Sequence, residues 1–145
     1  MCSEVNEIKK AYLKRYLASK RREEELRLSL EALETEYGLH SPRLDDMPHG
    51  SNHSDLSDFA ARYDKEYTAL IRILGESLKI YGEITQAIED SDCNETETCV
   101  LRYRYIHGYT WERIAVTMDY SYQWICELHG RALNHFKIPQ SLDSN

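Results

Sequence analysis

Residues 55 to 89 carry the most regular apolar pattern in this chain of 145 residues. Apolar side chains recur there every three or four positions, which predicts one long amphipathic helix that begins at Ser54 or Asp55 and ends near Glu89. The apolar positions are Leu56, Ala60, Tyr63, Tyr67, Leu70, Leu74, Leu78, Tyr81, Ile84 and Ile88. A seam of this length needs a partner helix, so the pattern restricts the chain to packed helices.

Residues 4 to 37 contain good helix formers and neither proline nor glycine, which predicts another long helix. A loop over residues 38 to 54 would let the two helices form an antiparallel, coiled-coil-like helical hairpin. Residues 19 to 25 of the first helix are polar all round, so we expect this section to cross solvent.

The polar section leaves part of the long apolar seam without cover, because residues 18 to 25 hold no large apolar group. An uncovered stripe of this size exceeds what a soluble monomer normally exposes. The pattern therefore predicts a homodimer or a higher homo-oligomer held by the second long helix. The predicted oligomer interface consists of Tyr67, Leu70, Leu74, Leu78 and Tyr81.

The next helix is predicted over residues 95 to 105. Asn94 has a typical N-cap side chain, and Glu97 follows at the position that completes a capping box. Gly108 supplies a left-handed residue just after the helix.

Two further short helices are predicted over residues 111 to 118 and 122 to 136. Thr110 and Ser121 are their N-caps, and residues 119 to 121 form a three-residue turn between them. Two short helices joined in this way form a helix-turn-helix, whose second helix enters the DNA major groove.

Each of the three short helices has an apolar stripe and is too short to be stable alone, so we expect the three to share one small core. The stripes are Val100, Leu101 and Tyr105, then Ile114, Ala115 and Met118, then Ile125, Leu128, Ala132 and Phe136. Asparagine in place of Ile125 should melt this three-helix part while the hairpin keeps its helicity. The pattern divides the chain into a hairpin and oligomerisation region (1 to 92), a helix-turn-helix domain (93 to 137) and a polar tail (138 to 145).

This C-terminal part resembles region 4 of sigma-70-type factors, which reads the promoter −35 element. The matching pattern is Thr110-x-x-x-Ile114-Ala115-x-x-Met118-x-x-Ser121-x-x-x-Ile125-x-x-Leu128-x-x-Arg131-Ala132-Leu133. The run LRYRYI-G-T-WE-IA-M-YS-LHGRAL is closer still to small phage and prophage transcriptional activators of the RinA/ArpU-like type. The resemblance implies an all-α, sequence-specific DNA-binding regulator of phage or prophage origin.

The resemblance also implies which residues contact double-stranded DNA. Base contacts would come from the start of the last helix, and phosphate contacts from residues around both N-caps. The candidates are Thr110, Arg113, Ser121, Tyr122, Gln123, Trp124, Cys126, Glu127 and Arg131. Sigma factors usually place arginines where Tyr122 and Trp124 stand, which leaves an alternative. These aromatic residues could instead pack against the hairpin, and the chain would then be a non-enzymatic scaffold module that docks on RNA polymerase or another phage protein.

The net charge of −7 counts against a general nucleic-acid binder, so DNA affinity would need dimerisation or a partner such as RNA polymerase. Residues 9 to 22 nevertheless contain seven Lys or Arg and no acidic residue. This run is either a solvated helix face or a phosphate contact.

No phosphate-binding glycine loop and no nucleophile elbow is present, so we expect no enzymatic activity and no cofactor. Two groups of potential metal ligands fit no standard zinc spacing, so we expect no metal site. They are His40, His49 and His53, and then Cys93, Cys99, Cys126 and His129. The four cysteines have no regular spacing, and the sequence predicts neither a secretory signal nor a membrane span. We therefore expect a cytoplasmic protein with free thiols.

Overall fold

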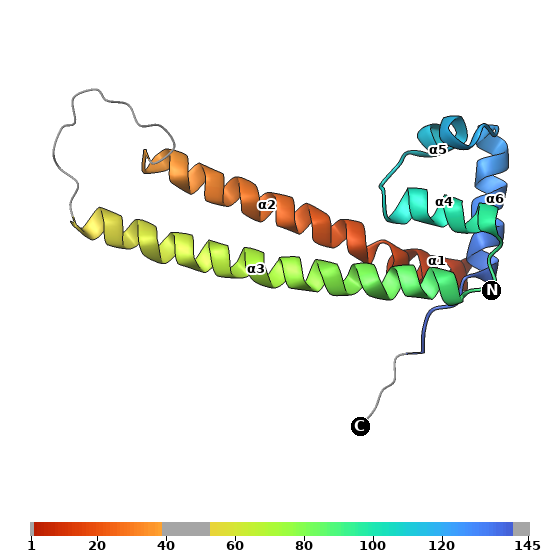
Figure 1. The fold of residues 1–145 in the computed structure, drawn as a ribbon, viewed down its shortest axis with the longest axis horizontal. Coiled ribbons are helices and arrows are strands. Elements are labelled where there is room, and N and C mark those ends of the chain that lie inside the picture. Colours follow the sequence, from red (N-terminus) through yellow and green to blue (C-terminus); the bar gives the residue numbers. More distant parts are fainter. Residues whose placement is uncertain (1, 39–52, 141–145) are drawn as a thin grey trace. The chain divides into compact units, whose positions relative to one another are not determined.

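A computed structural model describes residues 2–38 and 53–140, and its regular structure in these ranges is α-helical throughout (Figure 1). The helices are α1 (Cys2–Leu13), α2 (Arg15–Glu36), α3 (His53–Asp90), α4 (Glu95–Tyr105), α5 (Trp111–Met118) and α6 (Tyr122–His135). The prediction of an all-α protein is confirmed for this part of the chain. Most of the predicted loop, including His40 and His49, lies outside the described residues.

The prediction of a single first helix is wrong at one residue. Lys14 separates α1 from α2, although the backbone N–H of Lys14 still donates to the Lys10 carbonyl at 2.9 Å. The N–H of Ala18 likewise donates to the Lys14 carbonyl at 3.1 Å. No proline or glycine lies near this break, so the sequence contains no helix breaker that would have indicated it.

The described chain forms two compact units, and both of their boundaries fall inside helices. Unit 1 comprises Met1–Ala18 and Ser77–Asn145, and unit 2 comprises Ser19–Glu76. The predicted division at residue 93 instead followed the pattern of helices along the chain. By contacts, the last turns of α3 and all of α1 belong with α4, α5 and α6.

Unit 2 brings α2 and α3 together in opposite directions. Near the chain reversal, the rings of Tyr37 and Phe59 lie 4.9 Å apart between centroids, and the Tyr37 hydroxyl donates to Asp58 at 3.0 Å. The expectation that residues 19 to 25 cross solvent is wrong for two of them. Ser19 and Glu23 are buried, and the Glu23 carboxylate is paired with Lys20 at 2.9 Å.

Unit 1 contains two apolar clusters in place of the single small core that we expected. The first, the basal cluster, combines α1 and α3 with α4 and α6. It consists of Leu13, Ile84, Ala87, Ile88, Leu101, Tyr105, Ala132, Leu133 and Phe136. The second, the distal cluster, lies within α4, α5 and α6 and consists of Val100, Ile114, Ala115, Ile125 and Leu128. The predicted apolar stripes are therefore buried, apart from the half-buried Met118.

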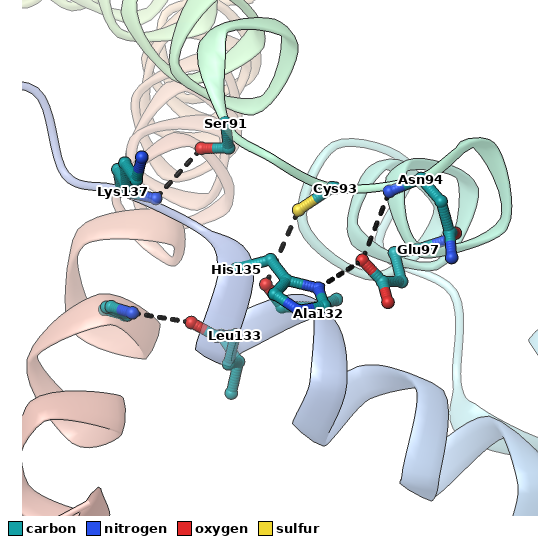
Figure 2. A network of polar contacts seen from close by, with 9 residues as sticks. Ser91, Cys93, Asn94, Glu97, Ala132, Leu133, His135 and Lys137 are labelled. Carbon is teal, nitrogen blue, oxygen red and sulfur yellow. Dashed lines mark hydrogen bonds and ion pairs between the residues drawn. The ribbon is translucent and has the colours of Figure 1, made fainter.

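Polar contacts fix the C-terminal end of α6 to its neighbours in unit 1 (Figure 2). The side chain of Glu97, buried at the start of α4, accepts from His135 Nδ1 at 2.8 Å. The Lys9 ammonium donates to the Leu133 carbonyl at 2.7 Å, and the Lys137 N–H donates to Ser91 Oγ at 2.9 Å. These contacts anchor the end of α6, where Phe136 leaves the helix in an extended conformation.

The predicted frayed tail is only partly described. Ile138 packs against the basal cluster, so the first residue of the tail is held in place. Residues 141–145 lie outside the described range.

Candidate nucleic-acid interface

The α5–turn–α6 segment has the local geometry that its sequence predicts. The hydroxyl of Thr110 accepts the N–H of Arg113 at 3.2 Å, and the hydroxyl of Ser121 accepts the N–H of Trp124 at 3.1 Å. Asp119 follows α5 in the left-handed conformation with φ 57°. Asparagine and aspartate adopt this conformation more readily than other residues with a Cβ atom. The predicted N-caps and turn are confirmed.

The start of α4 is also capped as its sequence predicts. The Asn94 side chain accepts the N–H of Glu97 at 2.8 Å, and the Glu97 carboxylate accepts the N–H of Asn94 at 3.2 Å. Gly108 has φ 70°, as expected for the residue that lets the chain leave α4. The capping box therefore defines the start of α4, and Gly108 lets the chain turn between α4 and α5.

The distal cluster sets which face of α6 is turned outward. Ile125 and Leu128 are buried against Ile114 and Ala115 of α5. The side chains that alternate with them along α6 remain exposed, namely Tyr122, Gln123, Cys126, Glu127 and Arg131. The first turns of α6 thus present a continuous polar and aromatic face to solvent.

Trp124 is placed differently from the other predicted base-contacting residues. Its ring is half-buried and packs against the distal cluster. The guanidinium of Arg131 lies over the same ring, 5.0 Å from its centroid. Trp124 is therefore chiefly a packing residue.

A stack of aromatic residues surrounds Arg113 at the start of α5. The rings of Tyr103 and Tyr109 are nearly parallel, at 6° with centroids 5.3 Å apart. The guanidinium carbon of Arg113 lies 3.8 Å from the centroid of the Tyr109 ring. Within the described residues, neither Arg113 nor Arg131 forms an ion pair with a carboxylate.

Two other arginines of unit 1 have structural partners. Arg104 donates to the Tyr109 carbonyl at 3.0 Å and lies 4.3 Å from the Trp111 centroid. Arg102 is paired with Glu89 at 2.8 Å. Arg104 thus holds the segment between α4 and α5 against α4, and Arg102 holds the end of α3 against α4.

A buried histidine, which the sequence pattern did not single out as a functional residue, connects the two clusters. The hydroxyl of Tyr105 lies 2.7 Å from His129 Nε2, and the Trp111 ring meets the imidazole edge-on at 4.5 Å. Burial lowers the pKa of His129 to about 4 and raises the pKa of Tyr105 to about 12. At neutral pH the imidazole is therefore uncharged, and its Nε2 shares a hydrogen bond with the phenol. The signal for this role was the position of His129 beside Ile125 and Ala132 on the packed face of α6.

Most of the basic side chains at residues 9 to 22 have an intramolecular partner. Lys10 pairs with Glu7 at 2.8 Å, and Arg15 pairs with Glu83 at 3.2 Å. Lys9 and Lys20 bond to the Leu133 carbonyl and to Glu23, as described above. More than half of these cations thus have an intramolecular role, which favours the solvated-face interpretation over phosphate contact.

No three His, Cys, Asp or Glu side chains come together as a metal site anywhere in residues 2–38 or 53–140. Burial raises the pKa of the Cys93 thiol to about 11, and its Sγ donates to the Ala132 carbonyl at 3.5 Å. Across the same ranges, none of the helices has both the length and the apolar character required to cross a membrane.

Comparison of the chain with known protein families, with curated proteins and with solved structures finds no match. The geometry of α5 and α6, together with the sequence pattern that they carry, is therefore the basis for a functional proposal.

Proposed function

We propose that this chain is a sequence-specific, DNA-binding transcriptional regulator of phage or prophage origin. In this proposal α5 and α6 form a sigma-region-4-like helix-turn-helix, and α2 with α3 forms the helical hairpin that accompanies it. The observation that carries the proposal is the exposed face of α6. Its apolar side chains are buried against α5 while Tyr122, Gln123 and Glu127 of its first turns are open to solvent.

The side chains of this face suit base edges in the major groove. The Gln123 amide can pair with adenine through two hydrogen bonds, and the Glu127 carboxylate can accept from the amino group of cytosine. Like other tyrosines, Tyr122 keeps its phenol protonated at neutral pH, so it can donate a hydrogen bond.

Phosphate contacts would come from Arg113 and Arg131, which are exposed and carry free positive charge on α5 and α6. The acidic side chains of Glu112, Asp119 and Glu127 lie on the same two helices and their turn, so the local charge is close to balanced. A single protomer should therefore bind DNA weakly, in agreement with the net charge of −7.

We further propose that the chain associates through α3, which would supply two recognition helices to one DNA duplex. In unit 2, α3 exposes Tyr67 and Ile71, and in unit 1 it exposes Leu78 and Tyr81. Leu70 has to be removed from the predicted interface because it is buried within unit 2, where it packs inward. Leu74 is half-buried and could contribute to the interface only in part.

The alternative function, a scaffold module that docks on RNA polymerase or another phage protein, has one specific observation in its favour. Val116 is 82% exposed on the face of α5 opposite the distal cluster, and Tyr120 is 42% exposed in the turn. Apolar groups so placed suit a protein partner better than a phosphate backbone.

A salt titration with duplex DNA separates the two functions. If the chain binds DNA, the logarithm of the affinity should fall linearly with the logarithm of the salt concentration. Arg131→Ala should lower that slope by about one, because one phosphate contact is lost. Arg62→Ala is the matched control, since Arg62 lies in unit 2 and is paired with Asp58 at 3.5 Å. The absence of binding even at low salt would favour the scaffold function.

A further inference from the structure

We propose that Tyr109 and Trp124 are positioning residues, which hold Arg113 and Arg131 ready for phosphate contact. This inference rests on the proposed DNA-binding function and names the device by which a nearly neutral surface could still bind DNA. Arg113 and Arg131 have no carboxylate partner among the described residues, and each lies over an aromatic ring. Arg113 lies over Tyr109, and Arg131 lies over Trp124.

Stacking on a ring leaves the hydrogen-bonding capacity of an arginine intact. The guanidinium is planar, and its five N–H donors lie in that plane. The guanidinium carbon of Arg113 lies 3.8 Å from the centroid of the Tyr109 ring, so the ring restrains the side chain while N–H donors that do not point at the ring remain available to an anion. A carboxylate partner would instead occupy the same donors and cancel the charge.

Both rings are themselves held by the fold. Tyr109 is stacked on Tyr103, and its carbonyl accepts from Arg104 Nη1 at 3.0 Å. The ring of Trp124 is half-buried against the distal cluster, and the backbone N–H of the same residue donates to the N-cap Ser121. Packed residues therefore fix the two rings in place, and the rings in turn restrain the two arginines.

This arrangement lowers the cost of ordering the arginines when DNA binds. A flexible, exposed side chain loses rotamer freedom on binding, and a side chain already restrained loses less. The gain should be several-fold in affinity for each arginine, which matters on a surface where acidic groups balance the basic ones. It should not change the number of phosphates contacted, because the charges are the same.

The test compares Tyr109→Phe with Tyr109→Leu, since phenylalanine keeps the ring and leucine removes it. Affinity for a labelled duplex of mixed sequence is measured by fluorescence anisotropy at several salt concentrations. We expect Tyr109→Phe to bind like the parent, and Tyr109→Leu to bind about threefold to tenfold more weakly with an unchanged salt slope. Trp124→Phe and Trp124→Leu should differ from each other in the same way.

A double-mutant cycle distinguishes positioning from a general effect on the fold. In the Arg113→Ala background, whose salt slope is lower by about one, Tyr109→Leu should have no further effect on affinity. Arg113→Lys leaves both rings in place and should weaken binding several-fold without changing the slope, because lysine has no planar group to stack. This variant keeps the test valid if Tyr109→Leu proves unstable.

The outcomes separate this inference from the proposed function. If the parent binds DNA but the leucine variants match their phenylalanine counterparts, or Arg113→Lys matches the parent, the positioning role is wrong and the DNA-binding function stands. An effect of Tyr109→Leu that persists in the Arg113→Ala background also overturns it. If the parent shows no salt-dependent binding at all, both proposals are wrong.

Discussion

The two apolar clusters of unit 1 differ in where along the chain their residues originate. The distal cluster is built from residues 100 to 128 only, and all of its helices are short and capped. The basal cluster uses the same α4 and α6 but adds Leu13 from α1 and Ile84 and Ile88 from α3. The segment from α4 to α6 therefore does not form its core alone. The basal cluster also needs α1, which lies more than eighty residues before α4 in the sequence, and the end of α3.

The largest expected effect comes from breaking the distal cluster. Ile125 is fully buried there, so Ile125→Asn should lower the free energy of unfolding by roughly 3–5 kcal/mol by burying an amide without a partner. Both tryptophans of the chain, Trp111 and Trp124, border this cluster, so their fluorescence reports its loss. Thermal unfolding followed by fluorescence and by far-ultraviolet circular dichroism measures the effect.

The matched control for this change is Val116→Asn, which makes a similar substitution on an exposed position of α5 and should cost less than about 0.5 kcal/mol. Because α4 and α6 serve both clusters, unit 1 should melt as a whole while helicity from unit 2 remains. If all helical signal is lost in one step with the fluorescence, the two units are not independent in stability.

A smaller effect on stability should come from protonating His129, whose hydrogen bond with Tyr105 connects the two clusters. The pKa of His129 falls from an ordinary value of 6.5 to about 4 on folding, so the unfolded chain binds a proton that the folded chain does not between these two pH values. Stability from this group is therefore complete above pH 6.5 and falls as the pH is lowered to 4. The total loss should be up to about 3 kcal/mol.

Denaturant titrations at several pH values measure this dependence. His129→Gln retains a hydrogen-bond partner for the Tyr105 hydroxyl but cannot be protonated, so it should flatten the decline. His107→Gln, at an exposed histidine, should leave the decline as in the parent. An equal decline in all three proteins would show that other groups cause it.

The smallest effect on the protomer is expected from the exposed face of α3. Leu78 is 74% exposed, so Leu78→Glu should leave the unfolding free energy nearly unchanged while it dissociates the proposed oligomer. Leu28→Glu makes the same change at a 55% exposed position of α2 and should leave association intact. Sedimentation equilibrium compares the variants with the parent, and a parent that is monomeric at its highest soluble concentration would refute the oligomer.

The sequence was a good guide where structure is local. The bounds of α4 and α5, the N-caps Asn94, Thr110 and Ser121, and the buried stripes could be predicted because each depends on neighbours within a few residues. The break at Lys14 had no local signal and was missed. Most of the candidate base-contacting face could be predicted in the same way, since helical periodicity alone turns Gln123 and Glu127 away from Ile125.

Features that depend on distant contacts could not be predicted from the pattern. The pairing of α1 and the end of α3 with α6 joins segments far apart in the chain, and periodicity does not say which apolar stripes meet. For the same reason the pattern could not separate Leu70, which packs within unit 2, from Tyr67, which is exposed. The aromatic partner of Arg113 depends on where the link between α4 and α5 runs, which no spacing rule specifies.

The central claim, that the exposed start of α6 reads DNA sequence, is tested most directly by selecting bound duplexes from a random library with the parent and with Gln123→Ala. We expect the parent to enrich a defined site, and Gln123→Ala to lose preference at one base pair with a cost of roughly 1–3 kcal/mol on that site. Gln140→Ala, a matched change at an exposed glutamine beyond α6, should enrich the parental site unchanged. If the parent enriches no sequence, or if Gln123→Ala enriches the same site with the same preference, α6 does not read DNA sequence through Gln123.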